Sequence, residues 1–448
     1  MVERTELDEL RQAIGQAALT RFVREAIQGE RARLLDDPSR AAPSELEVAA
    51  AVMRLAEQSF GSRARGIINA TGVLLHTNLG RAPLSPRAAR AVAETMRGYT
   101  AIELDLRTGK RGRRGAFLES ALAELSTAES AVVVNNCAAA VLLLLASVAR
   151  GRAVIVSRGE LVEIGGGFRV PDVMAESGAR LIEVGTTNKT RIADYQRALE
   201  ENADVAAILR VHPGNFRQTG FVERPPLAAL ASLARESGLP LLKDLGGGAL
   251  VDLGEAGFDG EPTVQGCVGA GANAVTFSTD KVLGGPQGGA IVGDRAIIDR
   301  IRKHPLLRAL RIGRLPLVAL EATLEAYLLG TAWAEVPALA MAKLDIEALR
   351  ERASRIASTV GDGARVVETT SEMGGGSLAG RAVPSVGLAI ATSTELSADA
   401  MTAELRKRGV IARVTNDEVI LDLRTVAASE DEALAVALRA AFAHVPIR

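Results

Sequence analysis

The sequence predicts an α/β protein whose main domain is a three-layer structure around a largely parallel sheet. Short apolar runs alternate with helical stretches from about residue 130 onward. These runs are hydrophobic almost throughout, as strands are when helices cover both faces of their sheet. Many of the 44 glycines follow the runs directly, where the backbone of an α/β protein can approach a ligand closely.

Residues 1 to about 65 are predicted to be helical. Residues 20–35 show helical spacing of apolar side chains, and a second helix over 44–60 opens with the capping-box pair Ser44 and Glu47. This block holds ten arginines, no lysine and eleven acidic residues, so it is nearly neutral. Its first ten residues lack an apolar core, which argues against a signal peptide. The stretch SFGSRARG at 59–66 predicts a linker or turn.

The central part of the chain supplies the strands of the predicted sheet. Seven runs are expected to be strands: 131–135, 153–157, 180–184, 205–211, 240–244, 274–278 and 289–293. Helices are expected between several of them, for example after the first run to about residue 149 and over 226–237.

The last third of the chain begins with a helical region over about 315–360. Strands at 386–392 and 419–423 and helices at 398–408 and 429–443 then predict a smaller α/β domain. We therefore expect three domains, over residues 1–65, 66–325 and 326–448.

Composition excludes several classes of protein. The 448 residues carry a net charge of −1, so no overall electrostatic field requires a nucleic acid or an acidic membrane. Cys137 and Cys267 show no metal-ligand spacing, and the four histidines are scattered, so we expect no metal site. The longest apolar run, 138–149, is shorter than the roughly 20 residues that span a bilayer. These features predict a cytoplasmic protein with reduced thiols.

Lys281 is the strongest candidate for a catalytic residue. The chain has only seven lysines, and Lys281 ends a predicted buried strand beside Ser278 and Thr279, just before a glycine-rich loop. A lysine in this position suits a Schiff base with pyridoxal phosphate (PLP). A solvated lysine at a turn is the alternative interpretation.

Two further segments have the order of a PLP site. Asp244 ends another strand about 37 residues before Lys281, and a carboxylate there would keep the pyridinium nitrogen of PLP protonated. The segment NNCAAAV at 135–141 runs from a strand into a helix, whose first N–H groups, around Asn136, Cys137 and Ala138, could bind the cofactor phosphate. Taken singly, Asp244 could be a helix cap or turn residue and Asn136 a plain helix cap.

Arginines form a fourth candidate feature. The segment RTGKRGRRG at 107–115, which includes Arg114, holds five cations, and Arg81, Arg308 and Arg311 lie in other glycine-rich or leucine-rich segments. Arginine is suited to bidentate binding of phosphate-like anions. A solvated charged face is the alternative for the run.

The chain resembles the bacterial selenocysteine synthases, the L-seryl-tRNA(Sec) selenium transferases, from about residue 20 to the end. The resemblance includes the segments INATGVLLHTNLGRAPLS (68–85), VVVNNCAAAVLLLLA (132–146), VSRGELVEIGGGFRVPDVM (156–174), EVGTTNKT (183–190), TFSTDKVLGGPQGGAIVG (276–293) and LLRALR (306–311). It implies a fold-type I PLP-dependent transferase that converts seryl-tRNA(Sec) to selenocysteinyl-tRNA(Sec) with selenophosphate, through an aminoacrylyl intermediate bound to PLP.

The resemblance also implies roles for particular residues. Lys281 matches the Schiff-base lysine, and three arginines match those that line an anion site, with Arg311 as a near alternative to the last: Arg81, Arg114 and Arg308. The residues expected at the cofactor are Lys281, Asp244, Asn136, Cys137, Ala138, Ser278 and His212. His76 and His212 are candidate proton carriers or, alternatively, hydrogen-bonded scaffold residues.

At the level of assembly, the resemblance implies a homodecamer of five dimers with active sites at the dimer interfaces, and an N-terminal block that binds tRNA. The chain departs from the family pattern at Cys137, Gly247, Thr279 and Gly288, and its near-neutral N-terminal block lacks a basic patch for RNA. Two alternatives are a related PLP lyase that acts on a small amino acid or amino-sugar acid without tRNA, and a non-catalytic homologue that binds RNA or a partner.

Overall fold

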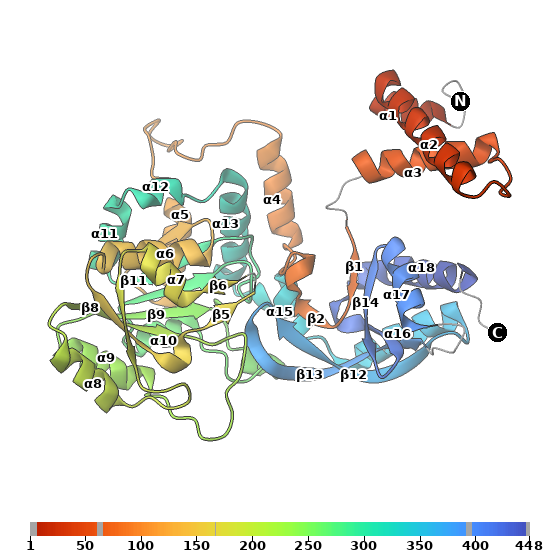
Figure 1. The fold of residues 1–448 in the computed structure, drawn as a ribbon. Coiled ribbons are helices and arrows are strands. Elements are labelled where there is room, and N and C mark those ends of the chain that lie inside the picture. The colour runs from red at the N-terminus through yellow and green to blue at the C-terminus, as the bar shows by residue number, and fades with distance from the viewer. Residues whose placement is uncertain (1–6, 61–65, 166, 391–396, 445–448) are drawn as a thin grey trace. The chain divides into compact units, whose positions relative to one another are not determined.

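The computed structural model describes residues 7–60, 66–165, 167–390 and 397–444. The chain divides into two compact units, Met1–Ile67 and Ile68–Arg448, which we call the N-terminal unit and the main unit (Figure 1). Each has its own hydrophobic core. Within the described part of the chain, no helix is both long and apolar enough to cross a membrane.

The N-terminal unit is helical, as predicted. It contains α1 (Asp8–Ile14), α2 (Gln16–Asp36) and α3 (Glu45–Phe60). Phe22 of α2 and Val52 of α3 lie in its buried core. Ser44 and Glu47 form the predicted capping box, because the Ser44 N–H donates to Glu47 Oε2 (2.6 Å) and the Glu47 N–H donates to Ser44 Oγ (3.3 Å). Most of the predicted linker, residues 61–65, lies outside the described residues.

The main unit is built on a seven-stranded sheet that contains all seven predicted strands. In spatial order these are β3 (Ser130–Val134), β11 (Gly289–Gly293), β10 (Ala274–Ser278), β9 (Leu241–Gly246), β8 (Val205–Val211), β4 (Ala153–Ser157) and β7 (Arg180–Val184). The sheet is largely parallel, and only β11 runs antiparallel to its neighbours β3 and β10. Every residue of β3, β4, β10 and β11 is buried, which explains why these strands are continuous apolar runs.

Helices cover both faces of this sheet, so the three-layer prediction is confirmed (Figure 1). One face packs against α6 (Cys137–Val148), α7 (Val170–Glu176) and α11 (Arg295–Lys303). The other packs against α5 (Ala116–Ser126), α8 (Ile192–Glu201), α9 (Leu227–Glu236), α10 (Val264–Gly269) and α13 (Arg314–Leu328). Alternate residues of one strand serve the two cores, with Val132 in the first and Val133 in the second.

A second, six-stranded sheet completes the main unit. Its order is β1 (Ile68–Ala70), β14 (Val410–Thr415), β15 (Glu418–Asp422), β13 (Ser377–Ile390), β12 (Arg365–Gly374) and β2 (Val73–Leu75). Three helices share its core: α16 (Ile346–Val360), α17 (Ala398–Lys407) and α18 (Asp431–His444). Residues 66–75 belong to the predicted cofactor-binding domain, but β1 and β2 pair with β14 and β12 of this C-terminal sheet.

Shorter elements connect these layers. They are α4 (Pro86–Met96), α12 (Leu306–Ala309), α14 (Ala332–Glu335), α15 (Pro337–Ala342) and the small hairpin of β5 (Glu163–Ile164) and β6 (Phe168–Arg169).

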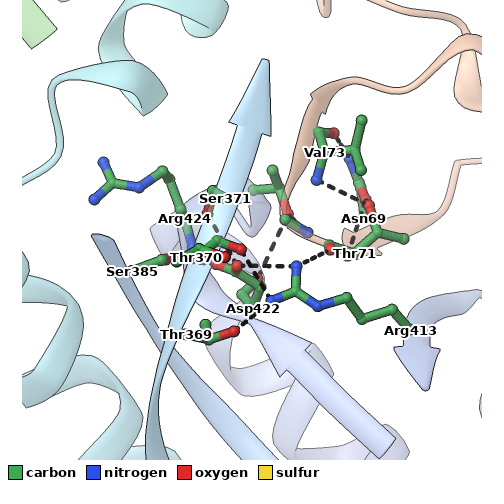
Figure 2. Close-up of polar contacts among 12 residues, drawn as sticks. Asn69, Thr71, Val73, Thr369, Thr370, Ser371, Ser385, Arg413, Asp422 and Arg424 are labelled. Atoms are coloured by element: carbon green, nitrogen blue, oxygen red, sulfur yellow. Dashed lines mark hydrogen bonds and ion pairs between the residues drawn. The ribbon is translucent and has the colours of Figure 1, made fainter. Parts of the chain in front are cut away.

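A buried polar network joins β1 and β2 to the C-terminal sheet (Figure 2). Asp422 is fully buried and accepts hydrogen bonds from Ser385 Oγ (2.6 Å) and Ser371 Oγ (2.9 Å). Arg413 Nη1 lies 3.4 Å from Asp422 Oδ2 and donates to the Thr71 carbonyl (2.6 Å). Gly72 has φ +76°, and a Cβ there would lie 2.3 Å from Asp422 Oδ2, so this turn requires glycine.

Candidate active site

A cavity of about 430 Å³ lies at the carboxyl ends of β9 and β10, beside the start of α6. This is the edge of the sheet where α/β proteins bind ligands. The cavity brings together seven of the predicted site residues: Arg81, Asn136, Cys137, Ala138, Asp244, Ser278 and Lys281. His212, Arg114, Arg308 and Arg311 are not among its lining residues.

Lys281 follows β10 by three residues and is 6% exposed. The loop after it folds back on the strand, because the Thr279 N–H donates to the Gly288 carbonyl (3.0 Å) and Thr279 Oγ1 donates to the Pro286 carbonyl (2.6 Å). Glycine backbone surrounds the lysine amine: a Cβ at Gly376 would lie 3.8 Å from Lys281 Nζ. The loop therefore fixes the lysine, and the glycine leaves space next to its amine.

Asp244 lies in β9 and is also buried. Its Oδ1 accepts hydrogen bonds from Thr276 Oγ1 (3.0 Å) and from Cys137 Sγ (3.7 Å). Burial raises the pKa of Asp244, while the Thr276 hydrogen bond and the charges of Lys243 and Lys281 oppose that rise. A buried carboxylate of this kind is stabilised by a cationic partner, which a protonated ring nitrogen would provide.

The start of α6 supplies donors for an anion. Asn136 caps the helix, with its Oδ1 accepting the Ala139 N–H (2.8 Å), and Cys137 and Ala138 line the cavity. Gly289 lets β11 approach this turn, since a Cβ there would lie 2.1 Å from the Asn136 carbonyl oxygen. Burial raises the pKa of the Cys137 thiol, so this side chain is a neutral donor and not a thiolate. An amine, a buried carboxylate and a helix N-terminus in one cavity fit PLP.

An ion pair forms one wall of the cavity and was only partly predicted. Arg81 Nη1 lies 2.6 Å from Asp280 Oδ2, and Arg81 has the unusual φ of +63° for a residue other than glycine. Asp280 was missed, although it directly precedes Lys281 in the sequence. Thr77 and Gln287 also line the cavity and were missed. Gln287 lies in the glycine-rich loop, which was the only signal available for it.

The remaining predicted arginines line a second cavity of about 380 Å³. Arg114, Arg308 and Arg311 are there together, with apolar side chains that include Leu118 and Leu317. Arg114 Nη2 donates to the Ile312 carbonyl (2.9 Å), and Arg311 Nη1 lies 3.3 Å from Glu103 Oε1. Within one chain the structure therefore places only Arg81 with Lys281.

The two candidate histidines differ in their surroundings. The backbone N–H of His212 donates to the Asp244 carbonyl (2.8 Å). The imidazole Nε2 of His212 lies 3.6 Å from Glu261 Oε2, and His212 lines two other cavities and not that of Lys281. His76 directly precedes Thr77, and its Nδ1 is buried with no hydrogen-bond partner in the described part of the chain. Burial lowers the pKa of His76, which favours a neutral imidazole.

Comparison with known proteins places these features among relatives. The family model for L-seryl-tRNA selenium transferase matches residues 67–427. The L-seryl-tRNA(Sec) selenium transferase of Moorella thermoacetica is 51% identical over 387 residues, which cover 84% of this chain and 82% of the relative. The enzyme of that name from Nitratidesulfovibrio vulgaris is 46% identical over 402 residues, which cover 86% of this chain and 84% of that relative.

A solved structure of D-glucosaminate-6-phosphate ammonia-lyase has the same fold. It superposes with a TM-score of 0.61 at 22% identity, covering 87% of this chain and 99% of that one. At this identity the likeness concerns the fold alone.

Proposed function

The chain belongs to the L-seryl-tRNA selenium transferase family, and from this premise we propose how its residues convert L-seryl-tRNA(Sec) to L-selenocysteinyl-tRNA(Sec). It is a PLP-dependent enzyme of fold type I. One observation carries the assignment of the active site: Lys281, Asp244 and the N-terminus of α6 meet in one cavity. The first two lie at adjoining strand ends, and α6 follows β3 on the same sheet.

Each of these groups has a distinct task. Bound PLP withdraws electrons from an attached amino acid, which makes the α-proton acidic and lets a substituent on the β-carbon leave. Lys281 Nζ would hold the cofactor and take the α-proton of the seryl group. Asp244 would keep the ring nitrogen protonated, and the N–H groups at the start of α6 would bind the phosphate. Ser278 lines the same cavity and completes the cofactor site, and His212 would support it from the neighbouring strand end.

We propose selenophosphate as the selenium donor. Arg81, held by Asp280, places a guanidinium in the cavity of Lys281 and can bind the phosphate part of the donor. Arg114, Arg308 and Arg311 would bind the same kind of anion from the second cavity. Their separation from Lys281 within one chain supports an active site that neighbouring copies complete together.

Exposed apolar side chains near the start of α5 support the assembly of this chain into dimers. Five such dimers would form the expected decamer. Tyr99, Leu104 and Leu106 are exposed in the segment between α4 and α5, and Phe117 is exposed at the start of α5. Exposed apolar groups gathered in one segment are typical of a surface that another chain covers. The segment also contains the arginine run at 107–115, so a dimer interface here would carry the arginines toward a neighbouring chain.

The N-terminal unit is proposed to bind tRNA(Sec). It has a separate helical core and a nearly neutral composition, so recognition would depend on the shape of the folded RNA more than on charge. An enzyme that consumes an aminoacyl-tRNA would work in the cytoplasm, where that substrate is made.

The decisive experiment is conversion of purified seryl-tRNA(Sec) with selenophosphate. The cofactor-loaded wild-type protein should form selenocysteinyl-tRNA(Sec), whereas Lys281→Arg, which keeps the positive charge but cannot hold the cofactor covalently, should form none above background. A cofactor-loaded wild-type protein that leaves the seryl-tRNA unchanged would refute the proposal. Activity of that protein on a small amino acid or amino-sugar acid would instead support the lyase alternative.

A further inference from the structure

A second group of charged side chains lies at the carboxyl ends of β8 and β9 and has no part in the proposed reaction. Arg210 of β8 and Lys243 of β9 are direct partners in the parallel ladder. Successive residues of a strand point to opposite faces, so Lys243 faces away from the side that Asp244 faces. Two cations therefore lie side by side on one face of the sheet, where like charges repel.

The nearby carboxylate of Glu160 already has two partners. Glu160 Oε1 lies 2.7 Å from Arg210 Nε, and Glu160 Oε2 accepts the Val211 N–H (3.0 Å). Lys243 is 5% exposed, and among the described residues its ammonium has no hydrogen-bond or ion-pair partner. Arg210 Nη1 is also buried and makes no hydrogen bond within the described chain. Positive charge in this cluster therefore exceeds the negative charge that the described residues supply.

These cations line a common cavity of about 330 Å³. Arg224 joins Arg210 and Lys243 in its wall, whereas Glu160 is the only Asp or Glu among the lining residues of the described chain. Arg224 donates one hydrogen bond, from Nη2 to Gln218 Oε1 (2.6 Å). Burial lowers the pKa of Lys243 and of Arg224, and the charge of Glu160 opposes the shift in both.

We propose that this cavity is a binding site for a small tetrahedral oxyanion, of the phosphate class, held by Lys243, Arg210 and Arg224. Guanidinium and ammonium groups from two strands and a loop approach the cavity together, which suits an anion that has several acceptor oxygens. Such an occupant would supply the missing negative charge. The charge of Lys243 lowers the pKa of the neighbouring Asp244. A bound anion would offset that charge, so occupancy of this site is linked to the protonation of the carboxylate proposed to bind the cofactor.

Binding of labelled inorganic phosphate to the full-length, cofactor-loaded protein tests the proposal by equilibrium dialysis. Lys243→Met should bind one phosphate fewer per chain than the wild type. Lys407→Met removes an exposed lysine of α17 and should bind as many phosphates per chain as the wild type. Since arginines elsewhere can also bind phosphate, the difference between the two variants is the decisive quantity. Equal binding by all three proteins would overturn the proposal.

Thermal unfolding provides an independent measurement. In phosphate-free buffer Lys243→Met should have a higher Tm than the wild type, because an uncompensated buried cation is gone. Added phosphate should raise the Tm of the wild type by several degrees more than that of the variant. If Lys243→Met does not fold, Arg224→Gln should weaken phosphate binding at least tenfold. If the Lys243 amine is neutral, phosphate should raise the Tm of the wild type and of Lys243→Met equally. That result would contradict the proposed site.

A phosphate monoester distinguishes two sources of the anion. Glycerol 3-phosphate that competes with inorganic phosphate would show that the site accepts the phosphate end of a small metabolite. Competition by sulfate but not by the monoester would restrict it to the free ion. Failure of both to compete would contradict an oxyanion site.

Discussion

Opposing effects act on the Asp244 carboxyl group. Burial favours its neutral form, and the nearby cations Lys243 and Lys281 together with the Thr276 hydroxyl favour its charged form. The net effect is a raised pKa, so the protein without cofactor holds a charge that its surroundings disfavour at neutral pH. A cationic ring nitrogen next to Asp244 would stabilise this buried charge. The stabilisation would add to the affinity of the site for PLP.

Asp244→Asn should therefore stabilise the cofactor-free protein at neutral pH. A carboxyl group whose pKa is raised on folding contributes stability below its unfolded pKa of about 3.9, and this contribution is lost as the pH rises through the folded pKa. The variant should gain about 1–3 kcal/mol at pH 7.5 and lose this advantage near pH 4. Chemical unfolding at both pH values measures the difference.

Asp362→Asn is the matched control, because Asp362 is exposed. It should leave the stability of the cofactor-free protein unchanged at both pH values. An Asp244→Asn variant that is less stable than the wild type at pH 7.5 would show that the surrounding cations outweigh burial.

Single residues also show what the sequence could and could not reveal about the site. Lys281, Asp244 and Asn136 could be predicted because each directly follows or ends a buried strand, and such strand ends meet at one edge of the sheet. The place of Asp280 in the cavity wall could not, because it depends on a contact with Arg81, 199 residues earlier in the chain. Arg114, Arg308 and Arg311 resemble Arg81 in type, and only the fold separates them into another cavity.

At the scale of elements, the turn between β1 and β2 depends on close packing. Gly72 has a positive φ and leaves no room for a side chain next to Asp422 and Arg413. The buried acid, the arginine and the neighbouring serines then hold the two short strands against the C-terminal sheet (Figure 2).

Gly72→Ala should destabilise the main unit well beyond the cost of its backbone conformation. Gly330→Ala is the matched control, because Gly330 has a similar φ of +72° and nothing within 4 Å of the added methyl group. The control should lose about 1–2 kcal/mol. Gly72→Ala should lose about 1–3 kcal/mol more, because the added methyl forces the buried network apart. Equal losses in the free energy of unfolding would mean that the network adapts at no cost.

The sequence predicts elements well where a strand is buried on both faces and poorly where it is not. All seven strands of the large sheet were predicted; six of them are almost wholly buried, and the exception is β7, where Arg180 and Glu183 are exposed. β12 and β14 were missed because exposed polar residues interrupt them, and β1 and β2 because three residues carry too little pattern. Only the last part of β13, where all residues from Ser385 to Ile390 are buried, was predicted.

At the scale of the whole molecule, the two units have separate cores and separate proposed tasks. The N-terminal unit would bind tRNA, whereas the main unit contains the cavity proposed to bind the cofactor. A helical unit of this size has little apolar surface to bury, so its stability is sensitive to single core residues.

Phe22→Ala should therefore affect only one of the two functions. Phe22 is 1% exposed in the core of the N-terminal unit, and its truncation should cost about 3–5 kcal/mol, enough to unfold that unit. Binding of tRNA(Sec) in a filter assay should be lost, while the visible absorbance of bound PLP stays unchanged. Leu35→Ala, at an exposed position of α2, should change neither. Loss of PLP from Phe22→Ala would show that the cofactor site depends on the N-terminal unit.

The pairing of β1 with β14 has a consequence for synthesis on the ribosome. Ile68 is in parallel register with Val410, 342 residues later in the chain, and its backbone N–H donates to the Gly409 carbonyl (2.8 Å). At roughly 5–20 residues per second, about 20–70 s separate the appearance of these two strands. During that interval the segment that becomes β1 and β2 has no native partner, while all the strands of the large sheet are synthesised. The C-terminal sheet is therefore completed only when β12 and β14 have been made and can pair with the first-made strands of the main unit.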